Sequence, residues 1–317
     1  MDTDGIISFS HEPVLLKEVI DALAIKPDGI YLDGTAGGGG HSSAIAARLT
    51  GGRLIALDRD PEAVAAAGAR LSQYGDRARV IRSNFSEIDS VCASLGITAL
   101  DGVLLDLGVS SHQLDTPERG FSYISDAPLD MRMDTSAALC AADVVNGYPR
   151  ERLEKIIYEY GEEKFASRIA SKICEKRETV PIKTTGELVN IIKSAIPAAA
   201  LRGAEHHPAM RTFQAIRIEV NGELDVIEPT IRKAVSMLAS GGRIAVITFH
   251  SLEDRRVKQT FAELARGCVC PPDFPVCVCG HKPEVRLVTK KPVTASPGEL
   301  ERNTRSHSAK LRTAEKL

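Results

Sequence analysis

The sequence predicts an α/β fold: a parallel sheet with helices on both faces, interrupted by an inserted helical domain. Two observations carry this prediction. In the first third of the chain, four short apolar segments alternate with segments of helical periodicity, which is the pattern of repeated strand–helix units. The first apolar segment runs directly into a glycine-rich loop, Asp33 to His41, as expected of a turn from a strand into a helix.

The expected elements follow one another in a regular order. A first helix is expected over 14–23, where Leu15, Val19 and Leu23 share one face. Further helices are expected at three places: 41–49, a segment opened by Asp60-Pro61, and a segment that ends near Gly96. Strands are expected at four places: 30–33, 53–58, 79–82 and 101–107.

The alternation stops in the middle of the chain. Residues 126–205 show helical periodicity and no strand signal, as in the stripe of Leu153, Ile156 and Ile157. Strands are expected again at three places, the last two at a sheet edge where antiparallel pairing is possible: 243–249, 285–289 and 309–313. We therefore predict a core formed by residues 1–125 and 206–317, interrupted by a helical domain at 126–205 that recognises the substrate.

The composition favours a soluble enzyme. With 317 residues and 43% hydrophobic content, the chain is long enough for one large domain or two moderate ones. The net charge of -2 gives no global basic field, and no apolar stretch approaches the roughly 20 residues of a membrane helix. The N-terminus lacks a basic segment followed by an apolar core, so we expect no signal peptide, no membrane attachment and a cytoplasmic location.

The glycine-rich loop indicates which cofactor it holds. Its glycines allow a ligand to approach the backbone, but the carboxylate of Asp33 does not suit the pyrophosphate of a dinucleotide. Ser42 also occupies the third glycine position of the dinucleotide pattern. S-adenosylmethionine has no phosphate and carries an amino group and a sulfonium, two cations that a carboxylate suits. The loop therefore favours S-adenosylmethionine, although a plain structural turn would share the pattern.

Ligands in an open α/β sheet bind beyond the carboxyl ends of its strands. Besides Asp33, this rule selects Asp58, which can accept hydrogen bonds from both ribose hydroxyls, and Asp106, beside the expected reaction centre. Phe85 could flank the adenine, and His250 is a second catalytic candidate. Each has a structural alternative: the carboxylates as loop caps, Phe85 as core, and the segment after His250 as a capping box.

Four of the seven cysteines lie close together in the sequence. Cys268 and Cys270 are separated by six residues from Cys277 and Cys279. Four thiols this close could bind zinc, although the Cys-x-Cys spacing differs from the Cys-x-x-Cys of common zinc loops. Free thiols or an oxidised pair are the favoured alternatives, and the odd total argues against a pure disulfide framework.

Several segments along nearly the whole chain resemble one protein family. They are His11 to Leu16, Asp33 to His41, Leu57 to Pro61, Leu104 to Asp115, Arg119 to Ser122, Pro128 to Asp134, Tyr160 to Glu163, His207 to Ala209, Arg211 to Ala215 and Phe249 to Arg255. The chain resembles the bacterial small-subunit ribosomal RNA cytosine-N4 methyltransferases, the methyltransferase H or MraW-like family. The resemblance implies a Rossmann-like, S-adenosylmethionine-dependent methyltransferase sheet with an inserted helical domain.

The resemblance also implies a reaction and a set of contacts. The reaction is methylation of the exocyclic N4 of a cytidine in the ribosomal decoding centre, with small-subunit ribosomal RNA or the assembled small subunit as partner and a homodimer as a possibility. The implied cofactor contacts are Gly39, Gly40, His41, Asp58, Phe85, Asp106 and Gln113. The alternative functions are a nicotinamide-dependent oxidoreductase and a non-catalytic cofactor-binding RNA or assembly factor.

The amino group of cytosine is a poor nucleophile, because its lone pair is delocalised into the ring. An enzyme must accept hydrogen bonds from this group and hold it in line with the methyl donor. Many amino-group methyltransferases use an Asp/Asn/Ser-Pro-Pro-aromatic loop, whereas this chain has Asp106-Leu107-Gly108-Val109. Our hypothesis is that Asp106 or nearby loop carbonyls accept the hydrogen bonds.

Candidate RNA contacts lie on a predicted helix over 213–224 and near it. Five polar side chains are candidates: Arg132, Arg211, Gln214, Arg217 and Asn221. The tail from residue 281 to 317 has nine Lys and Arg against four Asp and Glu, a bias that can follow a phosphate backbone. A solvated helix face and ordinary surface charge would give the same patterns.

Overall fold

The computed structural model describes residues 12–203, 205–271, 274, 276 and 278–317. The chain divides into two compact units, one of residues 1–108 and 224–317 and the other of residues 109–223. The second unit is wider at both ends than the expected 126–205. At its C-terminal side, α11 (Met210–Asn221) packs against α7 (Arg150–Gly161). The two backbones approach so closely that a Cβ on Gly161 would lie 2.6 Å from the carbonyl oxygen of Arg211.

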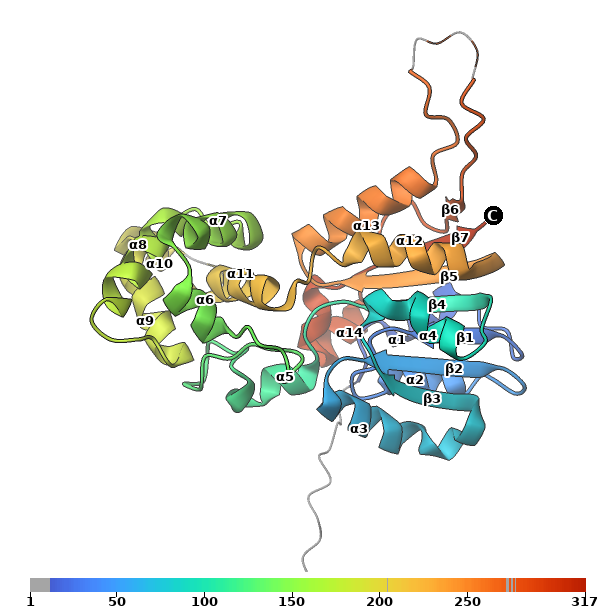
Figure 1. Cartoon of the computed structure of the whole chain (residues 1–317), viewed down its shortest axis with the longest axis horizontal. Coiled ribbons are helices and arrows are strands. Elements are labelled where there is room, and N and C mark those ends of the chain that lie inside the picture. The colour runs from blue at the N-terminus through green and yellow to red at the C-terminus, as the bar shows by residue number, and fades with distance from the viewer. Residues whose placement is uncertain (1–11, 204, 272–273, 275, 277) are drawn as a thin grey trace, which may run out of the picture. The chain divides into compact units, whose positions relative to one another are not determined.

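The first unit is built on a seven-stranded sheet with the order β3-β2-β1-β4-β5-β7-β6 (Figure 1). The strands are β1 (Ile30–Asp33), β2 (Arg53–Asp58), β3 (Ala78–Arg82), β4 (Leu100–Asp106), β5 (Leu238–Thr248), β6 (Val285–Leu287) and β7 (Lys310–Lys316). β1 to β5 run parallel, and β7 pairs antiparallel with β5 and β6. The predicted strands are confirmed, but β5 begins earlier than expected because Leu238 pairs with Leu100.

Helices cover both faces of this sheet. They are α1 (Leu16–Leu23), α2 (Gly40–Ala46), α3 (Pro61–Leu71), α4 (Ile88–Ser94), α12 (Ile227–Met237), α13 (Ser251–Leu264) and α14 (Pro297–Arg302), with 3₁₀ turns η1 (Ser72–Arg77), η2 (Phe85–Glu87) and η4 (Thr304–Ser308). α1, α2 and α3 are neighbours, as are α4, α12 and α13, which gives one group to each face. α1 begins at Leu16, because Leu15 has a left-handed backbone (φ 56°) and donates its amide to Glu299.

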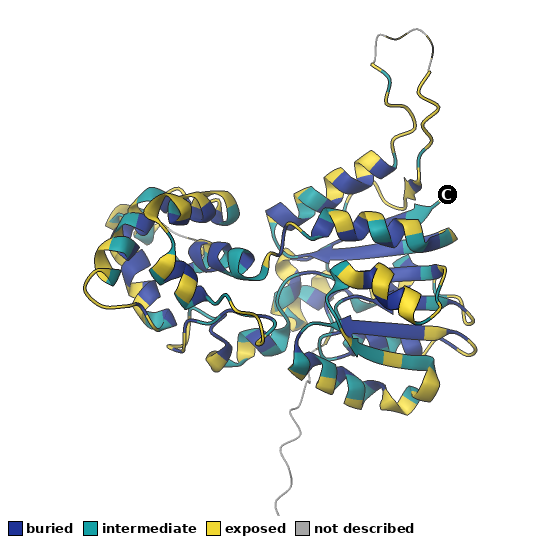
Figure 2. Cartoon of the chain, viewed as in Figure 1, coloured by how far each residue is buried: buried dark blue, intermediate teal, exposed yellow. Residues whose placement is uncertain are grey.

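The central parallel strands are buried along their length. Consecutive buried residues fill 54–57 in β2, 102–105 in β4 and 244–248 in β5, as the dark strands of Figure 2 show. Such runs are expected when helices cover both faces of a parallel sheet. The polar residues of these strands are therefore concentrated at the carboxyl ends, where β1, β2 and β4 each finish in an aspartate.

The second unit is built from helices, which confirms the helical character expected for the middle of the chain. They are α5 (Ser111–Asp115), η3 (Pro117–Arg119), α6 (Ala141–Gly147), α7, α8 (Ala166–Arg177), α9 (Thr185–Ala195), α10 (Ala198–Arg202) and α11. Their apolar faces share one core, which includes Leu153, Ile157, Ile169, Leu188, Ile192 and Phe213. Within the described part of the chain, no helix has the length and apolar character needed to cross a membrane.

Candidate active site

The loop between β1 and α2 has the close backbone packing that its glycines predict. Gly39 adopts a left-handed conformation (φ 76°), which L-residues with a side chain rarely adopt. At Gly40, the first residue of α2, a Cβ would lie only 2.4 Å from Cγ of Pro13. The glycines therefore fix how α2 begins, with its N-terminal amides at the carboxyl ends of the strands.

Replacing Gly40 with Ala is expected to destabilise the fold by about 1–3 kcal/mol, because the new methyl group overlaps Pro13. Gly68→Ala is a matched control within α3, where a Cβ would meet nothing within 4 Å. That variant should gain about 0.5–1 kcal/mol from the higher helix propensity of Ala. Thermal unfolding of the two variants checks the prediction, and equal melting temperatures would contradict it.

Asp33 accepts hydrogen bonds from two residues that follow it, one in the glycine-rich loop and one in α2. Its side chain is fully buried; one oxygen accepts the Ser42 hydroxyl at 2.6 Å, and the other accepts the Thr35 amide at 3.1 Å. Burial raises the pKa of Asp33, and these hydrogen bonds oppose the rise. The structure thus gives Asp33 a loop-holding role, and its direct contact with a cofactor stays a prediction.

Sequence reasoning missed Thr35. Its hydroxyl oxygen accepts the Asp106 amide at 2.6 Å, and its hydroxyl lies 3.4 Å from the Oδ1 atom of Asp33 as donor. Thr35 therefore joins the carboxyl ends of β1 and β4. Ser42 was noted only as a departure from the dinucleotide spacing, although it is the hydroxyl partner of Asp33. The sequence did contain a signal for Thr35 and Ser42, because each is a hydroxyl residue close to a run of glycines and alanines and can form hydrogen bonds there.

Asp58 receives two backbone amides at the end of β2. Its Oδ2 atom accepts the Gly37 amide at 2.8 Å, and its Oδ1 atom accepts the Asp60 amide at 2.9 Å. Burial raises the pKa of Asp58 to about 6, against the opposing effect of these two hydrogen bonds. Each carboxylate oxygen can accept more than one hydrogen bond, so both remain able to bind ribose hydroxyls. The structure makes Asp58 a brace of the glycine loop as well as a candidate ligand.

Asp106 and His41 face each other above the loop. The His41 ring is 94% buried, and its Nε2 atom lies 3.0 Å from the Val14 carbonyl, so Nε2 is the donor. Burial lowers the pKa of His41, which leaves Nδ1 as an unprotonated acceptor. This Nδ1 atom lies 3.6 Å from Oδ2 of Asp106. A proton on Oδ2 of Asp106 would therefore point at the lone pair on Nδ1 of His41.

The other oxygen of Asp106 is the most unusual atom of the site. Oδ1 is buried and has no hydrogen-bond partner in the described part of the chain, although the side chain as a whole keeps 25% exposure. Burial raises the pKa of Asp106 well above its ordinary value, and the charges of Asp33 and Glu253 raise it further. Buried acceptors without partners are rare and costly, so this oxygen is a strong candidate for contact with a ligand.

Two implied cofactor contacts differ in how far the geometry supports them. Phe85 opens η2 after Asn84, is half-buried, and lies against the loop: a Cβ on Gly34 would approach its Cβ atom to 2.9 Å. Gln113 belongs to the second unit and is buried there in the capping box of α5, where its Oε1 accepts the Ser110 amide at 3.0 Å. Adenine contact by Phe85 and cofactor contact by Gln113 both stay predictions.

His250 lies at the start of α13 and forms a capping box with Glu253. The Glu253 carboxylate accepts the Phe249 amide at 2.8 Å and the His250 amide at 3.3 Å, while Nδ1 of His250 accepts the Glu253 amide at 3.5 Å. A capping box is therefore present, but it is formed by His250 and Glu253 and not by Ser251 and Asp254, the pair that the sequence suggests. The catalytic role of His250 stays a prediction.

The candidate RNA contacts mostly have partners within their own unit, which contradicts an open polar helix face. Arg132 forms a bidentate pair with Asp130, and Arg217 forms one with Glu223 at 2.9 Å. Gln214 donates to the Tyr160 carbonyl at 2.9 Å. Asn221 donates to the Met131 carbonyl and accepts the Met133 amide, both at 2.8 Å. Gln214 and Asn221 thus join α11 to other segments of the second unit, whereas the partners of Arg132 and Arg217 lie close to them in the sequence.

Arg211 is the exception among the five. It is exposed, and only its Nη1 group is used in a hydrogen bond to the Glu162 carbonyl at 2.7 Å. Its remaining donors keep Arg211 available for a phosphate. Three of the four candidate metal ligands lie in the described part of the chain: the sulfur atoms of Cys268, Cys270 and Cys279 are within 4.8 Å of one another, whereas Cys277 lies outside the described residues.

Comparison with known proteins gives a match over nearly the whole chain. The model of the MraW methylase family matches residues 8–317. A ribosomal RNA small subunit methyltransferase H of Heliobacterium modesticaldum is 57% identical over 311 residues, covering 98% of this chain and 99% of the relative. Its counterpart from Symbiobacterium thermophilum is 56% identical over 312 residues and covers 98% of both chains. Among solved structures, an rRNA methylase from Streptococcus thermophilus aligns with a TM-score of 0.43 and 11% identity, over 98% of this chain and 99% of that one.

Proposed function

We propose that this chain, which belongs to the MraW methylase family, methylates the exocyclic N4 of a cytidine in small-subunit ribosomal RNA with S-adenosylmethionine as methyl donor. The names of its relatives support a ribosomal RNA substrate, and the relatives match almost their whole length. The family gives no support to a nicotinamide-dependent oxidoreductase. Such a substrate also makes the bacterial cytoplasm the place of action.

The residues around the glycine loop fit this cofactor. Bound S-adenosylmethionine would supply an electrophilic methyl group. Asp58 would accept the ribose hydroxyls, Phe85 would lie against the adenine, and the backbone at Gly39 and Gly40 would allow close approach. Burial raises the pKa values of Asp33 and Asp106, and a bound sulfonium would favour their ionised forms, whereas a pyrophosphate would be repelled by them.

The unpartnered Oδ1 atom of Asp106 is the single observation that carries the chemistry. It can accept a hydrogen bond from the cytosine amino group, which draws that nitrogen out of conjugation with the ring and fixes its direction. The Oδ2 atom faces His41, so the carboxyl group can hold a proton there without losing the acceptor on Oδ1. A strong base is unnecessary, because the methylated amine is acidic and loses its proton to water.

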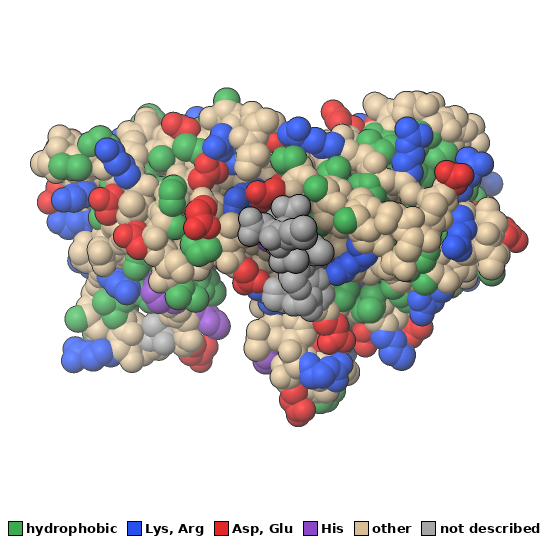
Figure 3. Space-filling view, turned by 90° about the horizontal axis from the view of Figure 1, so that it is seen from below, with side chains coloured by type: hydrophobic (Ala, Val, Ile, Leu, Met, Phe, Trp, Pro, Cys, Tyr) green, Lys and Arg blue, Asp and Glu red, His purple; other side chains and the backbone are tan. Residues whose placement is uncertain are grey.

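RNA recognition depends on local contacts. On the face drawn in Figure 3, Lys and Arg side chains alternate with Asp and Glu, in keeping with the net charge of -2. The target cytosine must be single-stranded or unstacked to reach Asp106. Arg211 is the candidate phosphate contact. The assembled small subunit is one possible substrate and its naked RNA the other, and a homodimer is compatible with either.

The reaction is tested by incubating the purified protein with isotope-labelled S-adenosylmethionine. Unmethylated small subunits and their naked RNA serve as separate substrates, and nucleoside mass spectrometry locates the label. We expect label in N4-methylcytidine with wild-type protein and none with Asp106→Ala. Cofactor binding without label in either RNA would instead indicate a non-catalytic assembly factor.

A further inference from the structure

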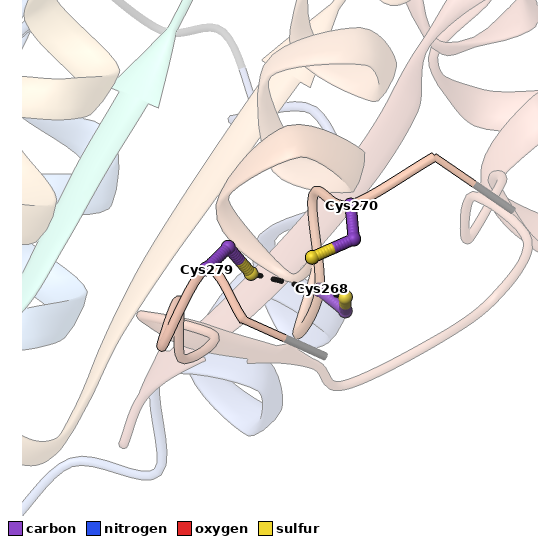
Figure 4. Close-up of side chains that lie close together, drawn as sticks. All are labelled: Cys268, Cys270 and Cys279. Carbon is purple, nitrogen blue, oxygen red and sulfur yellow. Dashed lines mark hydrogen bonds between the residues drawn. The ribbon is translucent and has the colours of Figure 1, made fainter. Parts of the chain in front are cut away.

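Three cysteine side chains meet in the loop between α13 and β6. Cys268 and Cys270 lie on the arm that leaves α13, and Cys279 lies on the arm that returns to β6. One sulfur of each lies within 4.8 Å of the others, and Figure 4 shows the three side chains turned toward one another. Each of the three offers one sulfur atom as a possible ligand. The cluster thus brings thiols from two separate segments to one point.

The spacing of the sulfur atoms fits a shared metal ion. The Sγ atoms of Cys268 and Cys279 lie 3.8 Å apart, far beyond a disulfide bond of about 2.05 Å. Four sulfurs at about 2.3 Å from a tetrahedral zinc ion lie about 3.8 Å from one another. The observed separation is therefore one edge of such a tetrahedron. Two thiols that share an S–H···S hydrogen bond can have the same separation, so it is the third sulfur within 4.8 Å that favours a shared ion.

Among the described residues of this loop, an apolar side chain on each arm is largely exposed and so contributes little to holding the arms together. Val269 on one arm is 51% exposed, and Val278 on the other is 73% exposed. At the base, the Glu284 amide donates to the Leu264 carbonyl at 2.8 Å, so the arms start close together. Beyond this hydrogen bond, described residues of the two arms come together again at the three cysteines. A small, exposed loop of this kind is typically stabilised by a metal or a cross-link.

We propose that Cys268, Cys270 and Cys279 bind one Zn²⁺ ion as thiolates and so fix the two arms of this loop. The remaining position of the tetrahedron is open to a fourth ligand, for which the exposed His281 is of the right chemical type. Thiolates are zinc's preferred ligands in structural sites, and binding displaces the thiol protons.

The site has a structural role, because it is remote from the reacting groups. α13 starts directly after the carboxyl end of β5, and its 14 residues span about 21 Å. The loop therefore leaves from the opposite end of the sheet to Asp106, as Figure 1 shows. Zinc here would order a projecting loop and take no part in methyl transfer.

The test uses the full chain, produced without a metal-binding affinity tag and purified with reducing agent but no chelator. We expect about one zinc ion per chain by elemental analysis. Cys268→Ser and Cys279→Ser should each lower this content at least about tenfold, because two thiolates cannot hold zinc as three do. Cys174→Ser, a half-buried cysteine of α8, is the matched control and should keep its zinc.

Two further measurements test the same zinc site independently of the zinc content. Cobalt(II) added to the zinc-free protein should give a thiolate charge-transfer absorption that is lost in Cys268→Ser. Trypsin should cut after the exposed Arg266 faster after chelation than before it, while cofactor binding stays unchanged. Zinc content below about a tenth of an equivalent in wild type after zinc loading, equal content in the cysteine variants, or a disulfide between these cysteines in protein purified without reducing agent would each overturn the proposal.

Discussion

Replacing Asp106 with Ala is expected to lower the rate of methyl transfer by on the order of 10²- to 10³-fold, the effect typical of removing one preorganised hydrogen-bonding group. The physical reason is the Oδ1 atom, which is buried, unpartnered and placed at the end of β4. Without this acceptor, the cytosine amino group keeps its lone pair in the ring. The rate should be measured in a single turnover at saturating S-adenosylmethionine, so that weaker cofactor binding does not lower the measured rate.

Asp106→Asn separates the acceptor from its charge. The amide keeps an oxygen for the cytosine amino group and can donate its NH₂ group to Nδ1 of His41, as a protonated Asp106 would. Because the amide keeps this acceptor, we expect the Asn variant to retain more rate than the Ala variant. Hydrogen bonds to a charged group are roughly twice as strong as neutral ones, so the Asn variant should stay below wild type where Asp106 is ionised. Full turnover in both variants would show that loop carbonyls, and not Asp106, accept the hydrogen bonds.

Asp101→Asn provides a control on the same strand. Asp101 lies near the amino end of β4, where it accepts hydrogen bonds from Lys26 at 2.8 Å and from the Ile30 amide at 3.0 Å. A carboxylate is lost from β4 in each case, but only Asp106 lies at the end where ligands bind. Asp101→Asn should therefore leave the single-turnover rate unchanged, with any stability loss visible in thermal unfolding.

The strands and the position of the site could be predicted because both depend on local pattern. An apolar run that ends in Asp predicts a buried parallel strand whose last residue lies at the ligand-binding edge of the sheet, and β1, β2 and β4 all end in this way. The start of α1 could not be predicted in the same way. The left-handed backbone of Leu15 stops the helix from starting earlier, and the Leu15 amide binds Glu299, which is 284 residues away in the sequence.

The polar side chains of α11 show a second limit. Periodicity correctly placed Gln214 and Asn221 on the polar side of a helix, but it could not reveal what that side faces. Asn221 bonds to Met131 and Met133, and Gln214 bonds to Tyr160, so a stripe that resembled an RNA-binding face is a packing contact. Gln113 gave no local signal at all, since a glutamine at the third position of a helix is an ordinary capping residue.

Cofactor affinity is expected to fall about tenfold between pH 7 and pH 5 because of Asp58. The ionised carboxylate accepts both ribose hydroxyls, and burial raises its pKa to about 6. At pH 5, one unit below this pKa, only about a tenth of the molecules carry the charge. Calorimetric titration with S-adenosylhomocysteine, which lacks the reactive methyl group, measures the affinity across this range. An affinity that is flat from pH 7 to pH 5 would contradict the ribose role.

The same raised pKa has the opposite effect on the stability of the protein without cofactor. Between about pH 4 and pH 6 the folded state holds the Asp58 proton and the unfolded state does not, so this group lowers the free energy of unfolding as pH rises. Asp58→Asn should remove both trends. Because an amide nitrogen facing the Gly37 or Asp60 amide would disturb the loop, the variant's melting temperature must be compared with that of wild type at each pH. A ribose contact predicts that affinity rises with pH while the stability of the cofactor-free protein falls, whereas a pure loop brace predicts the same fall in stability with an affinity that stays flat.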